Sequence, residues 1–173
     1  MNIFVLAGNP WDSAKMQCDK HIVKMPLETA QMLCSVWHRY GHGDKVPYKE
    51  AHKKHPCTLW AGDTKQNYKW LYHHGQELCA EYTRRYGRSH KCEGVIFELY
   101  HTPFEFDHYH ETIHPQCMPD EYKHNDVITA YRNYYLGAKK DIAKWDKGRQ
   151  APSWFKEKTM HLMVDGIFQT RRI

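Results

Sequence analysis

Four side chains that recur three and four residues apart give this sequence its first candidate for chemistry: His21, Lys24, Glu28 and Gln31. Side chains with this spacing share one face of a helix. A carboxylate such as Glu28 can stabilise a developing positive charge or transfer a proton while an N-glycosidic bond breaks, and His21 can orient it or relay the proton. Because Lys24 and Glu28 also have the spacing of an ordinary surface ion pair, both interpretations stay open at this point.

The helix that carries this row is predicted over residues 19–40. A second set of residues at the same spacing, which includes Ile22 and Trp37, is apolar and must face the core. We expect Asp19 to cap this helix and Gly41 to end it. One face of the helix therefore builds the fold, and another is available for chemistry.

Two more long helices are predicted from apolar residues at helical spacing. One is expected to begin at a cap on Asp63 or Thr64 and to run to about Tyr86, and the other covers about residues 127–145. Both carry cations toward their C-terminal ends, where the helix dipole is negative.

The remaining segments are predicted to be irregular. The short β-branched and aromatic run from Ile3 to Leu6 is expected to be a buried extended segment that joins no sheet. Residues 94–118, rich in histidine and aromatic side chains, are expected to form a long ordered loop. The sequence thus predicts one mostly α domain over residues 1–173, in which three long helices are wrapped by long loops.

Composition limits the function classes and the location. The formal net charge of +5 favours an anionic partner without proving one, and the 14% aromatic content suits stacking on flat ligands. The first eight residues, MNIFVLAG, have no cationic leader and form too short an apolar run for a membrane span. We therefore expect a cytoplasmic protein without a membrane partner, whose six cysteines are free thiols.

Known catalytic motifs and metal motifs do not decide the chemistry. No Walker-type loop, GxGxxG, GxSxG or HExxH is present, so phosphate-loop and hydrolase classes lose most of their support. Histidine and cysteine do recur at zinc-like spacing in three places: Cys18 with His21; His52, His55 and Cys57; His108, His110, His114 and Cys117. None is a clean zinc motif, and 14 histidines make chance spacings common, so we expect no cofactor and assign no residue to a metal.

The order of these features resembles the phage pyrimidine-dimer DNA glycosylase/AP lyase family, of the endonuclease V type. The resemblance consists of Asp19, His21 and Glu28 in the first helix, and of three later segments: HPCTLW…NYKWLYHHGQELCAEYTRRYG, MPDEYKHNDVITAY and PSWFKEK. It implies a compact, mostly α fold with the N-terminal segment threaded between three helices. It also implies that an N-terminal α-amine attacks C1′ of the damaged nucleotide to form an imine, with Glu28 supporting glycosyl cleavage and the later lyase step.

The N-terminus departs from the family pattern. The second residue is Asn2 and not a small residue, so we expect the initiator methionine to stay and the free amine to belong to Met1. Met1 and Asn2 are therefore catalytic candidates beside Glu28 and His21. Leu27 and Gln31 stand where the family would have cations.

The leading hypothesis is a DNA-acting enzyme that cleaves the N-glycosidic bond of a damaged or modified base, as a monomer on double-stranded DNA. If the chain is phage-encoded, it would act in the host cell. The flipped base that this chemistry needs is easiest to extrude where pairing is already weakened. DNA contacts are assigned to Lys24, Gln31, Arg85, Lys91, Lys139, Lys144 and Lys156, the cations among them to phosphates, with stacking near the lesion by Trp154 and Phe155.

Alternatives remain at the level of single segments and of the whole chain. The arginines around Arg85 can be a solvated helix end, and Trp154 with Phe155 can be an aromatic plug on the core. The whole chain can also be a phage-type transferase that modifies pyrimidine bases, or a non-enzymatic nucleic-acid-binding module with a structural zinc ion bound by its His/Cys pairs.

Overall fold

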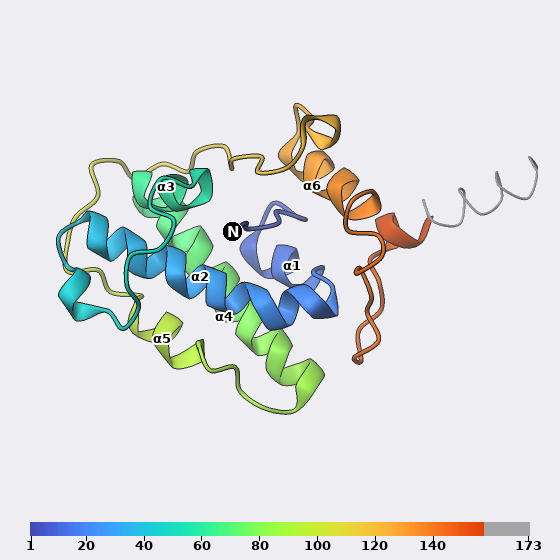
Figure 1. The fold of residues 1–173 in the computed structure, drawn as a ribbon, viewed down its shortest axis with the longest axis horizontal. Coiled ribbons are helices and arrows are strands. Elements are labelled where there is room, and N and C mark those ends of the chain that lie inside the picture. The colour runs from blue at the N-terminus through green and yellow to red at the C-terminus, as the bar shows by residue number, and fades with distance from the viewer. Residues whose placement is uncertain (158–173) are drawn as a thin grey trace, which may run out of the picture.

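The computed structural model describes residues 1–157, and all regular structure in that range is helical. This confirms the predicted mostly α class. The elements in chain order are α1 (Pro10–Lys15), α2 (Asp19–Arg39), the 3₁₀ turn η1 (Gly43–Lys45), α3 (Pro56–Asp63), α4 (Lys65–Tyr86), α5 (Glu93–Glu98), η2 (Asp120–Tyr122) and α6 (Val127–Leu136). Figure 1 shows α2 and α4 crossing at the centre, with α1 and α3 beside them and α6 on the far side of the N-terminus. No helix in this range has the length and apolar composition needed to cross a bilayer.

Helices α2 and α4 form the central packing contact. The indole Nε1 of Trp37 on α2 donates a 2.8 Å hydrogen bond to the hydroxyl of Tyr68 on α4. Gly75 permits the close approach of the two helices, because a Cβ at this position would lie 2.6 Å from Cγ2 of Thr29. The two helices share one buried core with the N-terminal segment.

The ends of α4 follow the predicted capping chemistry. The Thr64 hydroxyl accepts a 3.1 Å hydrogen bond from the Asn67 backbone N–H, which caps the first turn. At the other end Gly87 adopts a left-handed φ of 67° and its N–H bonds to the Thr83 carbonyl. The predicted span from a Thr64 cap to Tyr86 is therefore confirmed.

The N-terminal segment is buried without joining a sheet, as predicted. Its backbone is satisfied by side chains: the Ser13 hydroxyl accepts from Leu6 N (3.0 Å), and the Leu6 carbonyl accepts from the Arg132 guanidinium (2.9 Å). Phe4 has a φ of 59°, an uncommon conformation for a non-glycine residue. The segment therefore passes between α2 and α6 in a fixed and partly strained path (Figure 1).

Two boundaries differ from the prediction. The third helix, α6, ends at Leu136 and not near Trp145, and the predicted long loop over residues 94–118 includes most of the short helix α5. Beyond α6 the chain turns at Gly137 and continues without long regular structure. The lysines after Leu136 therefore do not continue the helix, because only the first half of the predicted span buries an apolar stripe.

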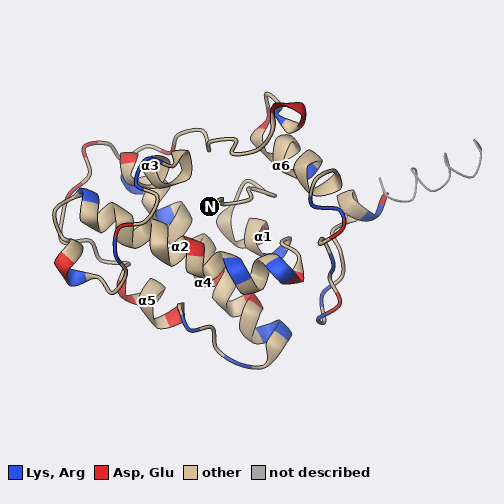
Figure 2. Cartoon of the chain, viewed as in Figure 1, with Lys and Arg blue, Asp and Glu red and all other residues tan. Residues whose placement is uncertain are grey.

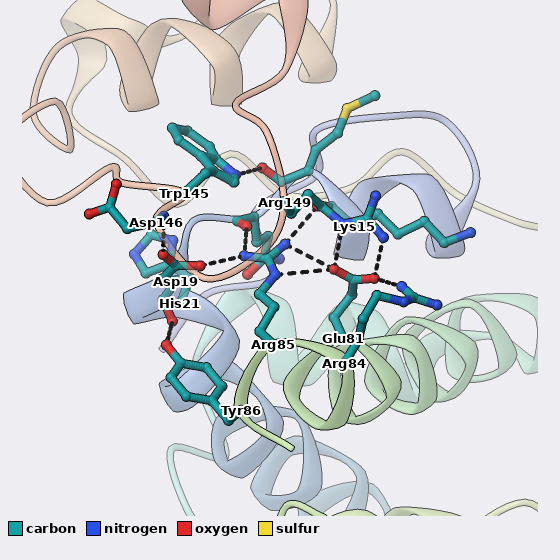
Figure 3. Close-up of polar contacts among 12 residues, drawn as sticks. Lys15, Asp19, His21, Glu81, Arg84, Arg85, Tyr86, Trp145, Asp146 and Arg149 are labelled. Carbon is teal, nitrogen blue, oxygen red and sulfur yellow. Dashed lines mark hydrogen bonds and ion pairs between the residues drawn. The ribbon is translucent and has the colours of Figure 1, made fainter. Parts of the chain in front are cut away.

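A buried ion network fixes the start of α2. The N-cap of α2 is Cys18, and Asp19 is already its first residue, which corrects the predicted cap. One Asp19 oxygen accepts from Arg85 Nη1 at 3.0 Å, and the other accepts from the Asp146 backbone N–H at 2.6 Å (Figure 3). Glu81 binds both Arg85 and Arg149, with Nη2 of Arg149 at 2.6 Å. The network therefore ties α2, α4 and the segment after α6 together.

Candidate active site

The N-terminus and the predicted polar row of α2 meet at a hollow of about 340 Å³, here called the N-terminal hollow. Its lining includes Met1, Asn2, His21, Lys24 and Glu28, together with Lys20, Cys117, Tyr134 and Lys139. Four of the residues predicted from spacing and resemblance, Met1, Asn2, His21 and Glu28, are thus neighbours in space.

Glu28 is the carboxylate of the N-terminal hollow, and its residue is only 9% exposed. Its Oε2 accepts a 3.0 Å hydrogen bond from the Asn2 backbone N–H and lies 3.9 Å from the Met1 ammonium. Its Oε1 lies 3.0 Å from Nζ of Lys24, one turn earlier on the helix. The surface-pair interpretation and the catalytic interpretation therefore apply to the same carboxylate, one to each oxygen.

The first two residues are held firmly beside Glu28. The Asn2 side-chain oxygen accepts from the Tyr131 hydroxyl at 2.8 Å, and its amide nitrogen donates to the Cys117 carbonyl at 2.8 Å. The Met1 side chain is 1% exposed, and its sulfur accepts a 3.5 Å hydrogen bond from the Thr58 hydroxyl. The amine thus lies between two anchored side chains, which is the kind of preorganisation that an attacking group needs.

His21 is a neutral group in this site. Its ring stacks on Phe4, with centroids 4.2 Å apart, and its Nδ1 lies 2.5 Å from the Tyr135 hydroxyl. Burial, and then the positive charges of Lys139 and Lys24, lower the pKa of His21 to about 3. At neutral pH the imidazole is therefore uncharged and can orient its neighbours, but it is too weak a base to accept a proton readily and is not a cation that donates one.

Three lysines surround the mouth of the N-terminal hollow. Lys20 and Lys24 are exposed on successive turns of α2, and Lys139 is half-buried with its ammonium 4.8 Å from the centre of the Tyr134 ring. In Figure 2, blue Lys and Arg positions occur on the first half of α2 and in the segment after α6. Such a cationic rim favours an anionic ligand.

Several residues that line the N-terminal hollow or bond to its lining are not predicted from the sequence. Lys20 stands four residues before Lys24, so the spacing that selects Lys24 could have selected it too. Tyr131 and Tyr135 belong to the apolar stripe of α6, which predicts a core position and no contact with the site. The contact of Asn2 with Cys117 joins residues 115 positions apart, and no local pattern signals it.

The predicted DNA-contact residues divide into groups. Lys91 is exposed and, with Lys24, lines a second hollow of about 620 Å³ that continues along α2. Lys144 and Lys156 are exposed in the C-terminal part of the described chain, and Gln31 is half-buried on α2 outside the N-terminal hollow. Of the predicted set only Lys24 and Lys139 line that hollow.

Arg85 and the aromatic pair occupy positions that differ from the predicted ones. The Arg85 side chain is fully buried and bound to Asp19 and Glu81, so no phosphate can reach it in this structure (Figure 3). Phe155 is 9% exposed and packs against Trp145, with centroids 4.8 Å apart. The ring of Trp154 lies 5.3 Å from the Arg132 guanidinium. The plug interpretation therefore fits this pair better than open stacking on bases.

Together, the fold and the site define an all-helical protein that presents a buried carboxylate to its own N-terminal amine, inside a hollow with a cationic rim. The family comparison agrees with that description. The model of the pyrimidine dimer DNA glycosylase family matches residues 1–94, more than half of the 173 residues, and the chain belongs to this family. The matched range contains Met1, Asn2, His21 and Glu28. No curated protein and no solved structure gave a match.

Proposed function

We propose that this protein cleaves the N-glycosidic bond of a damaged or modified pyrimidine in double-stranded DNA, with the Met1 amine as nucleophile and Glu28 as the catalytic carboxylate. The observation that carries the proposal is the position of the Glu28 carboxylate, 3.9 Å from the Met1 amine inside the N-terminal hollow. Family membership supports the reaction class.

The proposed chemistry begins with a proton transfer. Glu28 accepts a proton from the Met1 ammonium, and the freed amine attacks C1′ as the bond from C1′ to the base nitrogen breaks. The base leaves with the bonding electron pair and takes up a proton. That proton comes from Glu28, and the restored carboxylate stabilises the positive charge that develops on the sugar, an interaction that burial makes stronger than it would be in water.

An AP lyase step would follow from the same pair of groups. Loss of the ring oxygen from C1′ opens the sugar and gives an imine between C1′ and the amine. Removal of a proton from C2′ then expels the 3′ phosphate, and Glu28 is the carboxylate nearest the amine that could accept that proton. His21, neutral and fixed by the Tyr135 hydroxyl, would orient the sugar.

The mechanism is possible whether Met1 is retained or removed. If Met1 stays, its amine lies 3.9 Å from the carboxylate. If Met1 is removed, the nitrogen that becomes the α-amine is that of Asn2, which already lies 3.0 Å from Glu28 Oε2. Both forms place an amine beside Glu28, and the Asn2 residue stays anchored through its side chain.

DNA would bind as a monomeric complex through the lysines of the rim. Lys20, Lys24 and Lys139 would contact phosphates on either side of a nucleotide flipped toward the N-terminal hollow. Lys91 would extend this contact along the second hollow. The reaction would take place on DNA in the cytoplasm, in a host cell if the gene is carried by a phage.

Borohydride trapping tests the proposal directly. The protein is incubated with duplexes that carry a cis-syn thymine dimer or an abasic site, with an undamaged duplex as control, and the reduced adduct is located by peptide mass spectrometry. We expect an adduct on the N-terminal peptide with both modified duplexes, and the fragment masses assign it to Met1 or to Asn2. Absence of any adduct from a protein that still binds both duplexes would exclude the amine mechanism.

A further inference from the structure

Three potential metal ligands from distant parts of the chain meet beside the N-terminal segment. One ligand atom each of His55, Cys57 and Cys117 lies within 4.8 Å of the other two. His55 and Cys57 are at the start of α3, and Cys117 is in the loop that precedes η2. The spacing patterns in the sequence group Cys117 with three histidines, so this combination appears only in the fold.

The spacing of the two thiols fits a shared ion. The sulfur atoms of Cys57 and Cys117 are 3.5 Å apart and both cysteines are free. Two thiolates on a tetrahedral zinc ion, each at about 2.3 Å from the metal, are separated by roughly 3.8 Å. A disulfide would need about 2.05 Å. The observed separation is therefore closer to that of two ligands of one ion than to that of a bond.

The donor groups suit a thiophilic ion. Imidazole nitrogen and thiolate sulfur are ligands that zinc-type ions prefer in proteins, and His55, Cys57 and Cys117 supply one imidazole and two thiols. His55 Nδ1 now accepts a 3.2 Å hydrogen bond from the Cys57 backbone N–H, and an ion on that nitrogen would replace this long bond.

We propose that His55, Cys57 and Cys117 bind one thiophilic divalent cation of the zinc type, with a fourth position left for water. Such an ion would join α3 to the loop that supports Asn2, because the Cys117 carbonyl accepts from the Asn2 amide and the Cys117 N–H contacts the Tyr131 hydroxyl. It would therefore help to hold the N-terminal segment in place. This proposal does not depend on the reaction proposed above, since its readouts are metal binding and stability.

Titration with Co²⁺ tests the site, because thiolate ligands give Co²⁺ a charge-transfer absorption in the near ultraviolet. The full chain is stripped with a chelator, kept reduced with a phosphine and titrated, and bound Co²⁺ is then displaced with Zn²⁺. We expect one ion per chain with thiolate charge transfer. Cys117→Ser should reduce that absorption by about half and weaken binding at least about tenfold, since even supporting residues of metal sites contribute that much.

A pair of histidine variants provides the matched control. His55→Asn removes the imidazole but keeps a side chain that can cap α3, so it should weaken Co²⁺ binding without unfolding the helix. His52→Asn changes an exposed neighbour whose φ of 50° asparagine adopts readily, and it should bind Co²⁺ like the wild type. Zn²⁺ should raise the melting temperature of the wild type and of His52→Asn only.

The proposal is overturned if the wild type shows no thiolate charge transfer, or if Cys117→Ser leaves the absorption unchanged. Equal weakening by His52→Asn and His55→Asn would also overturn it, because the ion would then lie elsewhere. Borohydride trapping on DNA is a separate readout, so failure of one proposal leaves the other standing.

Discussion

Asp19 and Glu28 are two carboxylates on the same helix, nine residues apart, and the fold gives them opposite surroundings. Both oxygens of Asp19 are held by groups that keep their protons, the Arg85 guanidinium and the Asp146 backbone N–H. Glu28 is held by the Asn2 backbone N–H and by two ammonium groups, those of Met1 and Lys24. Lys24 is 69% exposed, whereas the Arg85 side chain is fully buried.

The difference separates a structural carboxylate from a reactive one. A guanidinium does not lose its proton in proteins, so the pair of Asp19 with Arg85 can only hold the chain in place. An ammonium can give up its proton and then attack an electrophile, so Glu28 has a partner with which it can do chemistry. The residue types alone, two acids on one helix, do not distinguish these roles, whereas their partners do.

The largest expected effect comes from Glu28→Gln. The amide keeps the shape of the side chain but cannot accept the proton of the ammonium, so single-turnover cleavage of a dimer-containing duplex should fall by about 10² to 10⁴-fold. The variant should stay folded: the loss in its free energy of unfolding, measured with denaturant, should be much smaller than the increase in the activation free energy of cleavage. A variant that cleaves at the wild-type rate would remove Glu28 from the mechanism.

Asp19→Asn should show the reverse pattern. It removes one of the two carboxylates that bind the buried Arg85 guanidinium, while Glu81 remains, so the free energy of unfolding should fall by about 1–3 kcal/mol. Urea titration followed by circular dichroism measures this loss. The protein that remains folded should still cleave damaged DNA within a few-fold of the wild type. If Asp19→Asn abolished cleavage without loss of stability, the division between the two carboxylates would be incorrect.

The sequence predicts the reactive half of this comparison better than the structural half. Helical spacing places His21, Lys24 and Glu28 on one face because such spacing depends only on local geometry. The partners of Asp19 come from residues 66 and 127 positions away, and no local pattern encodes those contacts. The prediction that Arg85 contacts DNA fails for the same reason, since a basic helix end looks alike in sequence whether it faces solvent or a buried acid.

The C-terminal boundary of α6 is also beyond the reach of local patterns. Apolar spacing and a run of lysines predict a helix to residue 145, but the chain leaves the helix after Leu136 at Gly137. Long-range contacts fix the path of the next residues, such as the indole of Trp145 donating to the Met16 carbonyl. Propensity predicts the helix start, which Asp126 caps, and tertiary packing determines its end.

Acid should affect the two regions unequally, because His21 belongs only to the reactive one. Its pKa is about 3 in the fold and ordinarily 6.5, so below pH 6.5 the unfolded chain binds a proton that the folded chain does not. The free energy of unfolding should therefore fall as the pH drops from 6.5 toward 3, by up to about 1.4 kcal/mol per pH unit for this histidine. His74 and His114, whose pKa values are about 3 and 4, add to the same slope.

The variant His21→Gln isolates the contribution of the site. In urea titrations between pH 7 and pH 4, the free energy of unfolding of this variant should fall less steeply with decreasing pH than that of the wild type. The difference in slope should correspond to about one proton bound on unfolding, whatever the absolute stability of the variant. His108→Gln, at an exposed position, is the control and should retain the wild-type slope. An unchanged slope in His21→Gln would mean that His21 is not a buried neutral group.

The smallest expected effect separates the two ends of α2. Lys24→Met removes a cation from the rim of the N-terminal hollow, so the slope of log affinity for damaged duplex against log salt should become about one unit less steep. Arg39→Met is the control. Arg39 lies 15 residues after Lys24 on the same helix, about 22 Å away by the helix rise, and it already forms an ion pair with Asp63. Its slope should match the wild type when both are measured by fluorescence anisotropy. Equal slopes for all three proteins would mean that DNA does not approach over the first half of α2, and Glu28 would then have no substrate beside it.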